Sequence, residues 1–312
     1  MADKPVYDLK GGKPHPYHLV NPSAWPLVGA FAAGLLAMGA IFFMHADFQL
    51  HLAPTLELFG RAFGGAPALD GEALTFSVSN MGLKGVLFGF LAVLAVMWVW
   101  WRDVIKEAVV EKAHSPITKI GFRYGMVLFI ASEVMFFVAF FWAFFNASLF
   151  PTEAVGSIWP PASVEVVETF GLPFLMTLVL LLSGCTVTWA HHAILENNQE
   201  DTVKALTITV ALGALFTCIQ VYEYVHATFG FKDGIYSSAF YMATGFHGFH
   251  VLVGSIFLLV CLFRAKKGHF TAESHFGFEA AAWYWHFVDV VWLFLFAAVY
   301  WWGNAGGIVA AH

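Results

Sequence analysis

Residues 124–150 read YGMVLFIASEVMFFVAFFWAFFNASLF, and this stretch decides the fold. It is apolar throughout, apart from a few small polar side chains and one carboxyl group, Glu133. The hydrocarbon core of a bilayer is about 30 Å thick, and a helix with a rise of about 1.5 Å per residue needs roughly 20 apolar residues to cross it. The stretch is therefore predicted to be a transmembrane helix, long enough to tilt or to protrude.

Similar runs lie on both sides of it. The sequence is 59% hydrophobic and only 12% charged, whereas a soluble domain has roughly 25% charged residues. The runs are spread too evenly to leave room for a separate soluble domain. We predict one all-α integral membrane domain, 1–312, with seven transmembrane helices. Their expected spans are 25–44, 85–101, 124–150, 172–191, 205–225, 237–263 and 280–302.

Basic side chains segregate to one side of these spans. Of the 15 Lys and Arg residues, only Arg61, Lys84 and Lys232 fall on the side opposite the N-terminus. The positive-inside rule therefore places the N-terminus in the cytoplasm or matrix, and an odd number of spans places the C-terminus outside. The polar residues 1–23 lack the apolar core of a signal peptide and are expected to remain in the mature protein.

Two connections stand out by length and composition. Residues 45–84 form the longest one, expected to be an outside loop with little structure of its own. Pro151, Pro160 and Pro161 follow the third span, and we expect them to end that helix and to delay the next one.

Carboxyl groups at membrane depth each need a partner or a function, because insertion of a charge costs at least about 2.5 kcal/mol. Glu133 lies near the middle of its span. Two interpretations stay open: a proton-linked or lipid-facing regulatory carboxyl, or a protonated acid that hydrogen-bonds a neighbouring helix. His250 reaches a similar depth and is a candidate partner. Asp289 lies three residues after His286, and we favour a structural pair on one helix face.

Two pairs of neighbouring histidines lie in or near the spans. His247 and His250 share a helix face, and His191 and His192 are adjacent at the inner end of theirs. A haem or copper site would need matching ligands from another helix at the same depth. We therefore favour helix–helix hydrogen bonds and predict no metal site in this chain.

The three cysteines, Cys185, Cys218 and Cys261, all lie inside apolar runs. They contain no C-x-x-C motif, and an odd number of cysteines is not typical of a disulfide framework. We expect them to be small packing residues.

Several strings in the sequence together resemble the cytochrome c oxidase subunit III family of the haem–copper respiratory oxidases. Taken in order they cover nearly the whole chain, and the C-terminal string is the most specific. The strings are HPYHLVNPSAWPL at 15–27, WWRDV at 100–104, SEVMFF at 132–137 with FWA at 141–143, TWAHH at 188–192, ATGFHGFH at 243–250, and HFGFEAAAWYWHFVDVVW at 275–292.

The resemblance implies a fold and a role. In that family two helices lean away from the other five and form a V-shaped cleft that holds phospholipid. Haem a, haem a3, CuA and CuB belong to partner subunits I and II, and cytochrome c supplies the electrons that reduce O2 to water. The subunit stabilises the catalytic core, retains structural lipid, and supports proton uptake and sustained turnover. We expect no cofactor on this chain and no nucleic-acid partner.

The resemblance also assigns residues. Glu133 matches the family's intramembrane carboxyl. His15 and His18 lie near the inner surface, where imidazole could collect protons because it titrates close to neutral pH. Basic groups at the inner interface would attract anionic headgroups. The positions that resemble the lipid cleft or its rim are Trp101, Glu107, His114, His250, Arg264, Lys267 and His269.

The loop 45–84 is longer than in compact mitochondrial members of the family. This length favours a bacterial protein in the cytoplasmic membrane, and its C-terminus would then lie in the periplasm. Related quinol oxidase subunits usually lack the first two helices, so the presence of these helices favours the cytochrome c enzyme over a quinol oxidase.

A proton-coupled transporter using Glu133 and Asp289 is a weaker alternative, because the sequence has no internal repeat. A haem-binding membrane cytochrome is the third hypothesis.

Overall fold

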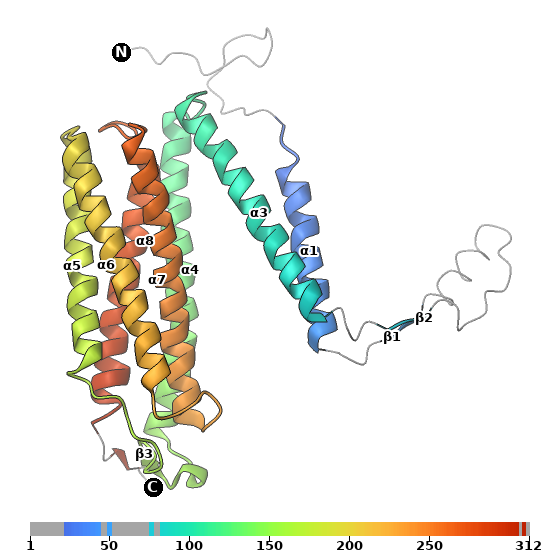
Figure 1. The fold of residues 1–312 in the computed structure, drawn as a ribbon, viewed down its shortest axis with the longest axis vertical. Coiled ribbons are helices and arrows are strands. Elements are labelled where there is room, and N and C mark those ends of the chain that lie inside the picture. The colour runs from blue at the N-terminus through green and yellow to red at the C-terminus, as the bar shows by residue number, and fades with distance from the viewer. Residues whose placement is uncertain (1–21, 45–48, 52–74, 78–81, 306–307, 310–312) are drawn as a thin grey trace, which may run out of the picture. The chain divides into compact units, whose positions relative to one another are not determined.

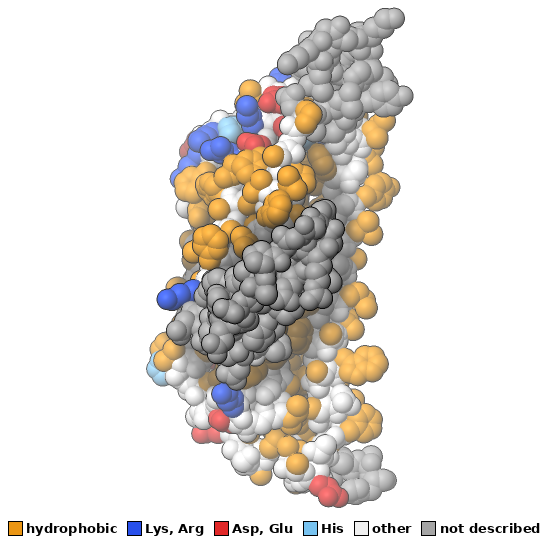
Figure 2. Space-filling model, turned by 90° about the vertical axis from the view of Figure 1, so that its right-hand side faces the viewer, with side chains coloured by type: hydrophobic (Ala, Val, Ile, Leu, Met, Phe, Trp, Pro, Cys, Tyr) orange, Lys and Arg blue, Asp and Glu red, His pale blue; other side chains and the backbone are white. Residues whose placement is uncertain are grey.

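The computed structural model describes residues 22–44, 49–51, 75–77, 82–305 and 308–309. Seven helices in these ranges are long and apolar enough to cross a membrane, which confirms the predicted all-α, multi-pass membrane fold (Figure 1). Hydrophobic side chains are exposed along their sides, as Figure 2 shows for one face. The helices are α1 (Trp25–Met44), α3 (Gly82–Val109), α4 (Pro116–Leu149), α5 (Leu172–Leu195), α6 (Gln199–His226), α7 (Ile235–Lys266) and α8 (Phe276–Leu295).

Most helices extend beyond the predicted apolar windows. The bounds of α1 are as predicted, but α3 continues to Val109 and α4 begins at Pro116 instead of residue 124. Hydropathy detects only the part in hydrocarbon, whereas helical backbone bonding continues into the polar interface. Local sequence fixes some of these ends. Asn198, for example, caps α6 by accepting a hydrogen bond from the backbone N–H of Asp201 at 3.2 Å.

The chain divides into two compact units, and the first, Met1–Pro116, contains α1 and α3. These two helices pack through glycine. A Cβ atom on Gly39 would overlap the backbone of Gly85, and one on Gly89 would overlap the backbone of Leu36. Gly85 and Gly89 therefore form a packing surface on α3. On α1 the close approach is made at Gly39, whereas no atom lies within 4 Å of a Cβ built on Gly34.

The long connection between α1 and α3 has some regular structure. β1 (Gln49–His51) pairs antiparallel with β2 (Thr75–Ser77), in a register that puts Leu50 opposite Phe76. Two short stretches far apart in the loop thus pair with each other, and the expectation of little structure stays a prediction for the loop as a whole. The rest of the loop lies outside the described residues.

The second unit, Ile117–His312, contains α4 to α8. In it α5 contacts α6, α6 contacts α7, α7 contacts α8, and α8 returns to α5. The core is aromatic: Trp285 and Trp292 of α8 are fully buried and donate hydrogen bonds to Ser183 and Thr177 of α5, at 2.8 and 2.9 Å. Because each indole N–H finds a hydroxyl, these large side chains fill the core without an unsatisfied donor.

The ends of α4 and α8 are irregular. α4 stops at Leu149, just before Pro151, as predicted, and a 3₁₀ turn, η1 (Glu153–Val155), and β3 (Ile158–Trp159) follow. α8 continues into a π-helical segment, η2 (Phe296–Trp302), after which β4 (Ile308–Val309) pairs antiparallel with β3. A π-helical turn widens the helix and changes the direction of the side chains on it. Tyr300 on η2 is fully buried.

Candidate functional site

The second unit joins Glu133 of α4 to His250 of α7. Oε2 of Glu133 lies 2.9 Å from Nε2 of His250, and Nδ1 of the same imidazole donates to the backbone carbonyl of Phe246 at 2.6 Å. A neutral imidazole that donates through Nδ1 can only accept through Nε2. A proton must therefore lie between Glu133 and His250, and the pair holds it at membrane depth. The hydrogen bond to a neighbouring helix, one of the two interpretations left open for Glu133, is thus present, and the regulatory interpretation stays a prediction.

Aromatic rings enclose this pair. The ring centroids of Phe137, Tyr284 and Phe287 lie 4.9, 6.3 and 6.1 Å from that of His250. Only 7% of the His250 side chain and 22% of the Glu133 side chain are exposed. Protein therefore encloses the imidazole of His250, whereas part of the Glu133 side chain reaches the surface of this unit.

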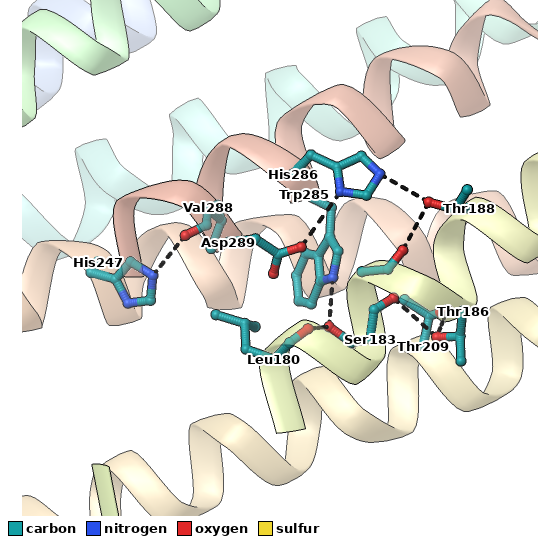
Figure 3. Close-up of polar contacts among 11 residues, drawn as sticks. Leu180, Ser183, Thr186, Thr188, Thr209, His247, Trp285, His286, Val288 and Asp289 are labelled. Carbon is teal, nitrogen blue, oxygen red and sulfur yellow. Dashed lines mark hydrogen bonds and ion pairs between the residues drawn. The ribbon is translucent and has the colours of Figure 1, made fainter. Parts of the chain in front are cut away.

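A second polar cluster connects α5 and α8 (Figure 3). Oδ2 of Asp289 lies 3.5 Å from Nδ1 of His286, and Nε2 of that ring lies 3.3 Å from Oγ1 of Thr188. Thr188 itself donates to the carbonyl of Gly184 at 2.9 Å. A Cβ atom on Gly184 would lie 2.5 Å from Asp289 Oδ2, so only glycine leaves room for the carboxyl. The predicted His286–Asp289 pair is confirmed.

His247 is also engaged by the protein. It is fully buried, and its Nε2 donates to the carbonyl of Val288 on α8 at 3.2 Å, as Figure 3 shows. Its ring packs against Phe216 and Trp292, with centroids 5.7 and 5.1 Å apart. Both histidines of the 243–250 string therefore make helix–helix hydrogen bonds, as predicted.

A basic cluster lies at the C-terminal end of α7. The guanidinium of Arg264 stacks over the ring of Phe270 at 4.5 Å and contacts Gly277. Burial, together with the positive charges of Arg264 and Lys267, lowers the pKa of His269 below its ordinary value. None of these three basic side chains makes an ion pair with an acid among the described residues. The cluster is therefore positively charged and uncompensated.

The remaining predicted residues fall elsewhere. Trp101 and Glu107 lie on α3, where Trp101 is 60% exposed, and His114 follows the end of that helix. These three residues belong to the first unit, whereas His250 and the basic cluster belong to the second. The predicted proton-collecting residues His15 and His18 lie outside the described residues.

One cluster was missed by the sequence analysis. Glu279 accepts two hydrogen bonds from Arg123, at 2.9 and 3.0 Å. Nε2 of His275 lies 3.5 Å from Oε1 of Glu279 and 3.4 Å from Nε2 of His191. Nδ1 of the same ring donates to the backbone carbonyl of Thr271 at 2.9 Å. The predicted helix–helix hydrogen bond of His191 is thus confirmed. The i, i+4 spacing of His275 and Glu279 was the available signal.

The same cluster contains a group that could hold a metal ion. The ligand atoms of His191, His275 and Glu279 lie within 4.8 Å of one another. Arg123 already occupies both carboxylate oxygens of Glu279, so a metal would compete with an existing ion pair. The absence of a metal from this chain stays a prediction.

Glu223 lies near the C-terminal end of α6, yet it is buried, with only 4% of the residue exposed. Its Oε1 accepts hydrogen bonds from Tyr300 at 2.7 Å and from Gln220 at 3.1 Å. The π-helical segment η2 carries Tyr300, so an irregularity that hydropathy does not reveal supplies one of the donors to this carboxyl.

Comparison with known proteins identifies the family. The family model of cytochrome c oxidase subunit III matches residues 59–304. Proteins named cytochrome c oxidase subunit 3 from Prototheca wickerhamii and Oncorhynchus mykiss are each 49% identical over 93% of this chain, covering 99% and 98% of their own lengths. The protein of that name from Marchantia polymorpha is 50% identical over 93% of this chain and 97% of its own length. The chain therefore belongs to the cytochrome c oxidase subunit III family.

Proposed function

We propose that this chain is the non-redox subunit III of a proton-pumping cytochrome c oxidase. In this role it stabilises the catalytic core formed with subunits I and II, holds structural phospholipid, and supports proton uptake and sustained turnover. Haem a, haem a3, CuA and CuB would reside in those partner subunits, and cytochrome c would be the substrate of the complex.

The Glu133–His250 pair carries this proposal. Both ring nitrogens of His250 already make hydrogen bonds within the protein, and His247 donates to a backbone carbonyl. Imidazoles engaged in this way act as structural cross-links between helices. The pair also keeps one proton close to a partly exposed carboxyl, which suits a helper of proton uptake. His15 and His18 remain candidates for collecting protons at the surface.

The basic cluster supports the proposed lipid role. Arg264, Lys267 and His269 lie together at the C-terminal end of α7, without an acidic partner among the described residues. Cations at a cytoplasmic membrane interface attract anionic headgroups by about 1 kcal/mol each. A phosphate group would neutralise the cluster, while acyl chains would lie along exposed apolar side chains of the helices. We extend the same role to Trp101, Glu107 and His114 of the first unit and to His250.

We further propose that the N-terminus lies in the cytoplasm and the C-terminus in the periplasm. The basic cluster after α7 and Arg123 near the start of α4 fall on the same side as the N-terminus in this topology. A bacterial membrane remains our prediction from the length of the loop 45–84, although the relatives cited come from an alga, a liverwort and a fish.

Oxygen consumption tests the supporting role. The complex purified with this chain, and the same complex after the chain has been removed, would be followed during continuous turnover with reduced cytochrome c. We expect similar initial rates, because the redox centres are retained, and a shorter active lifetime after removal. An unchanged lifetime would contradict the supporting role, and loss of all initial activity would contradict the assignment of catalysis to the partner subunits.

A further inference from the structure

Glu223, near the C-terminal end of α6, is a buried carboxyl group that the proposed function does not use. Glu223 and Gln220 are each only 4% exposed, and they share a helix face at the i, i+3 spacing. Nε2 of Gln220 donates to Oε1 of Glu223 at 3.1 Å, and the hydroxyl group of Tyr300 on η2 donates to the same oxygen at 2.7 Å. One oxygen of the carboxyl group therefore accepts two hydrogen bonds.

The other oxygen and the amide oxygen of Gln220 accept none. Oε2 of Glu223 and Oε1 of Gln220 are buried and have no hydrogen-bond partner among the described residues. They belong to the same carboxyl and amide groups that meet at 3.1 Å, so the two oxygens lie on adjoining groups. Both are acceptors when the carboxyl group is ionised, and each buried acceptor without a donor is destabilising. One proton on Oε2 of Glu223, donated to Oε1 of Gln220, would satisfy both oxygens.

The orientation of the Gln220 amide does not remove the need for a proton. The oxygen and nitrogen of an amide have nearly the same shape, and their assignment depends on the hydrogen bonds around them. Turning the amide over would place its oxygen 3.1 Å from Oε1 of Glu223. Two acceptor oxygens at that distance need a proton between them.

Neighbouring hydroxyl groups have no proton left for Oε2. Three tyrosines besides Tyr300 interact electrostatically with Glu223: Tyr224, Tyr236 and Tyr241. A hydroxyl group has a single proton to donate. In the same order, these three hydroxyl groups donate to Oγ1 of Thr244, Oδ1 of Asn304 and the carbonyl of Phe229, at 2.7, 2.7 and 2.8 Å.

No cation balances a charge on Glu223 among the described residues, because none of their ion pairs includes it. His226, three residues further on, is exposed, and its Nδ1 donates to the carbonyl of Tyr222 at 2.9 Å. Apolar packing covers the site, since the ring of Phe240 on α7 lies 5.3 Å from that of Tyr300. An ionised carboxylate that is buried without a cation is far more costly than a neutral acid.

We propose that Glu223 is a buried proton-binding site, which holds its proton on Oε2 and donates it to the amide oxygen of Gln220. The carboxyl and amide groups then form a cyclic pair with two hydrogen bonds, and Oε1 also accepts from Tyr300. The neutral acid joins α6 to η2. It gives the second unit another buried proton besides the one between Glu133 and His250. The site goes beyond the proposed function, because it needs neither lipid nor a partner subunit.

Infrared spectroscopy of the full chain in detergent at neutral pH tests this site. The C=O stretch of a protonated carboxyl group lies at a higher frequency than the bands of a carboxylate. The spectrum of Glu223→Gln would be subtracted from that of the wild type. We expect the loss of one acid band per chain, which shifts in D2O because it carries an exchangeable proton. Glu200→Gln is the matched control, since Glu200 is exposed and paired with Lys204 at 2.7 Å, and it should remove only carboxylate bands.

Two tyrosine variants test the hydrogen bonds of the acid. Tyr300 and Tyr236 are both fully buried and both donate through their hydroxyl groups at 2.7 Å, but only Tyr300 donates to Glu223. A hydrogen bond to a C=O group lowers its stretching frequency. Tyr300→Phe should therefore move the acid band to higher frequency, and Tyr236→Phe should leave it in place.

Each outcome decides the proposal. If Glu223→Gln removes only carboxylate bands, Glu223 is ionised and the proposal is wrong. An acid band that Tyr300→Phe leaves unmoved would also overturn it, because the acid would then lie outside this hydrogen-bonded group. If Glu223→Gln fails to fold, the tyrosine variants decide, since both retain Glu223. The measurement needs only this chain, so a failure of haem to co-purify would overturn the proposed function and leave this result standing.

Discussion

Oε2 of Glu133 on α4 lies 2.9 Å from Nε2 of His250 on α7, although the two residues are 117 positions apart in the chain. Because Nδ1 of His250 donates to Phe246, this contact needs a proton between the carboxyl and the imidazole. The pair is therefore both a cross-link between two helices and a store for one proton.

Glu133→Gln should leave assembly and electron transfer in the core largely intact. The glutamine amide can donate to Nε2 of His250 in place of the carboxyl proton, so the cross-link keeps its geometry. Glu133→Ala should be less stable by about 1–3 kcal/mol, because it leaves a buried acceptor without a partner. Haem content and the midpoint of thermal inactivation would be measured for both. Loss of the assembled complex in the glutamine variant would contradict this interpretation.

Gly184→Ala should destabilise the packing of α5 against α8. The added methyl would lie 2.5 Å from Oδ2 of Asp289, and overpacking of a core costs about 1–3 kcal/mol. Gly125→Ala on α4 is the matched control, because no atom lies within 4 Å of a Cβ built there. Thermal unfolding of the detergent-solubilised chain would show a lower midpoint only for the first variant. Equal midpoints would mean that the carboxyl can move away at little cost.

Arg264→Gln should reduce bound phospholipid and shorten active lifetime. The substitution keeps part of the side-chain volume over Phe270 but removes the uncompensated charge. Lys204→Gln is the control, because Lys204 is exposed and already paired with Glu200 at 2.7 Å. Lipid that co-purifies with the complex would be quantified by mass spectrometry. The same lipid content in the Arg264 variant and the wild type would remove this residue from the proposed lipid site.

His269 should make the chain less stable at acidic pH. Its pKa in the folded protein is lowered by burial and by the neighbouring positive charges. The unfolded chain therefore binds a proton more readily, so the stability that this group contributes is present above its ordinary pKa of about 6.5 and declines as the pH falls below it. Thermal midpoints at pH 8 and pH 5.5 would be compared for the wild type and His269→Gln. An equally steep pH dependence in the variant would assign the effect to other groups.

Hydropathy was sufficient to predict the seven helices, since lipid requires long apolar segments with internally bonded backbones. The depth of Glu133 and His250 along their spans was enough to suggest that they pair. Helix ends were harder to place, because α3 and α4 continue as helices where the sequence is no longer apolar.

Contacts between distant residues explain the errors. Glu279 meets Arg123 across 156 positions, and Glu223 meets Tyr300 across 77 positions through a π-helical turn. Spacing along one helix suggests which residues share a face but not which face a neighbouring helix covers. Glu223 therefore lies near the end of its helix and is nevertheless buried by tertiary packing.

The visible redox difference spectrum of the tagged, natively purified chain tests the central claim most directly. It would be recorded for the purified complex, for the remainder after the chain has been stripped away, and for the chain alone. We predict that haem a and copper co-purify, that they stay with the remainder, and that the isolated chain is colourless. A chain that purifies without any redox partner, or that keeps haem by itself, would contradict its role as a non-redox oxidase subunit.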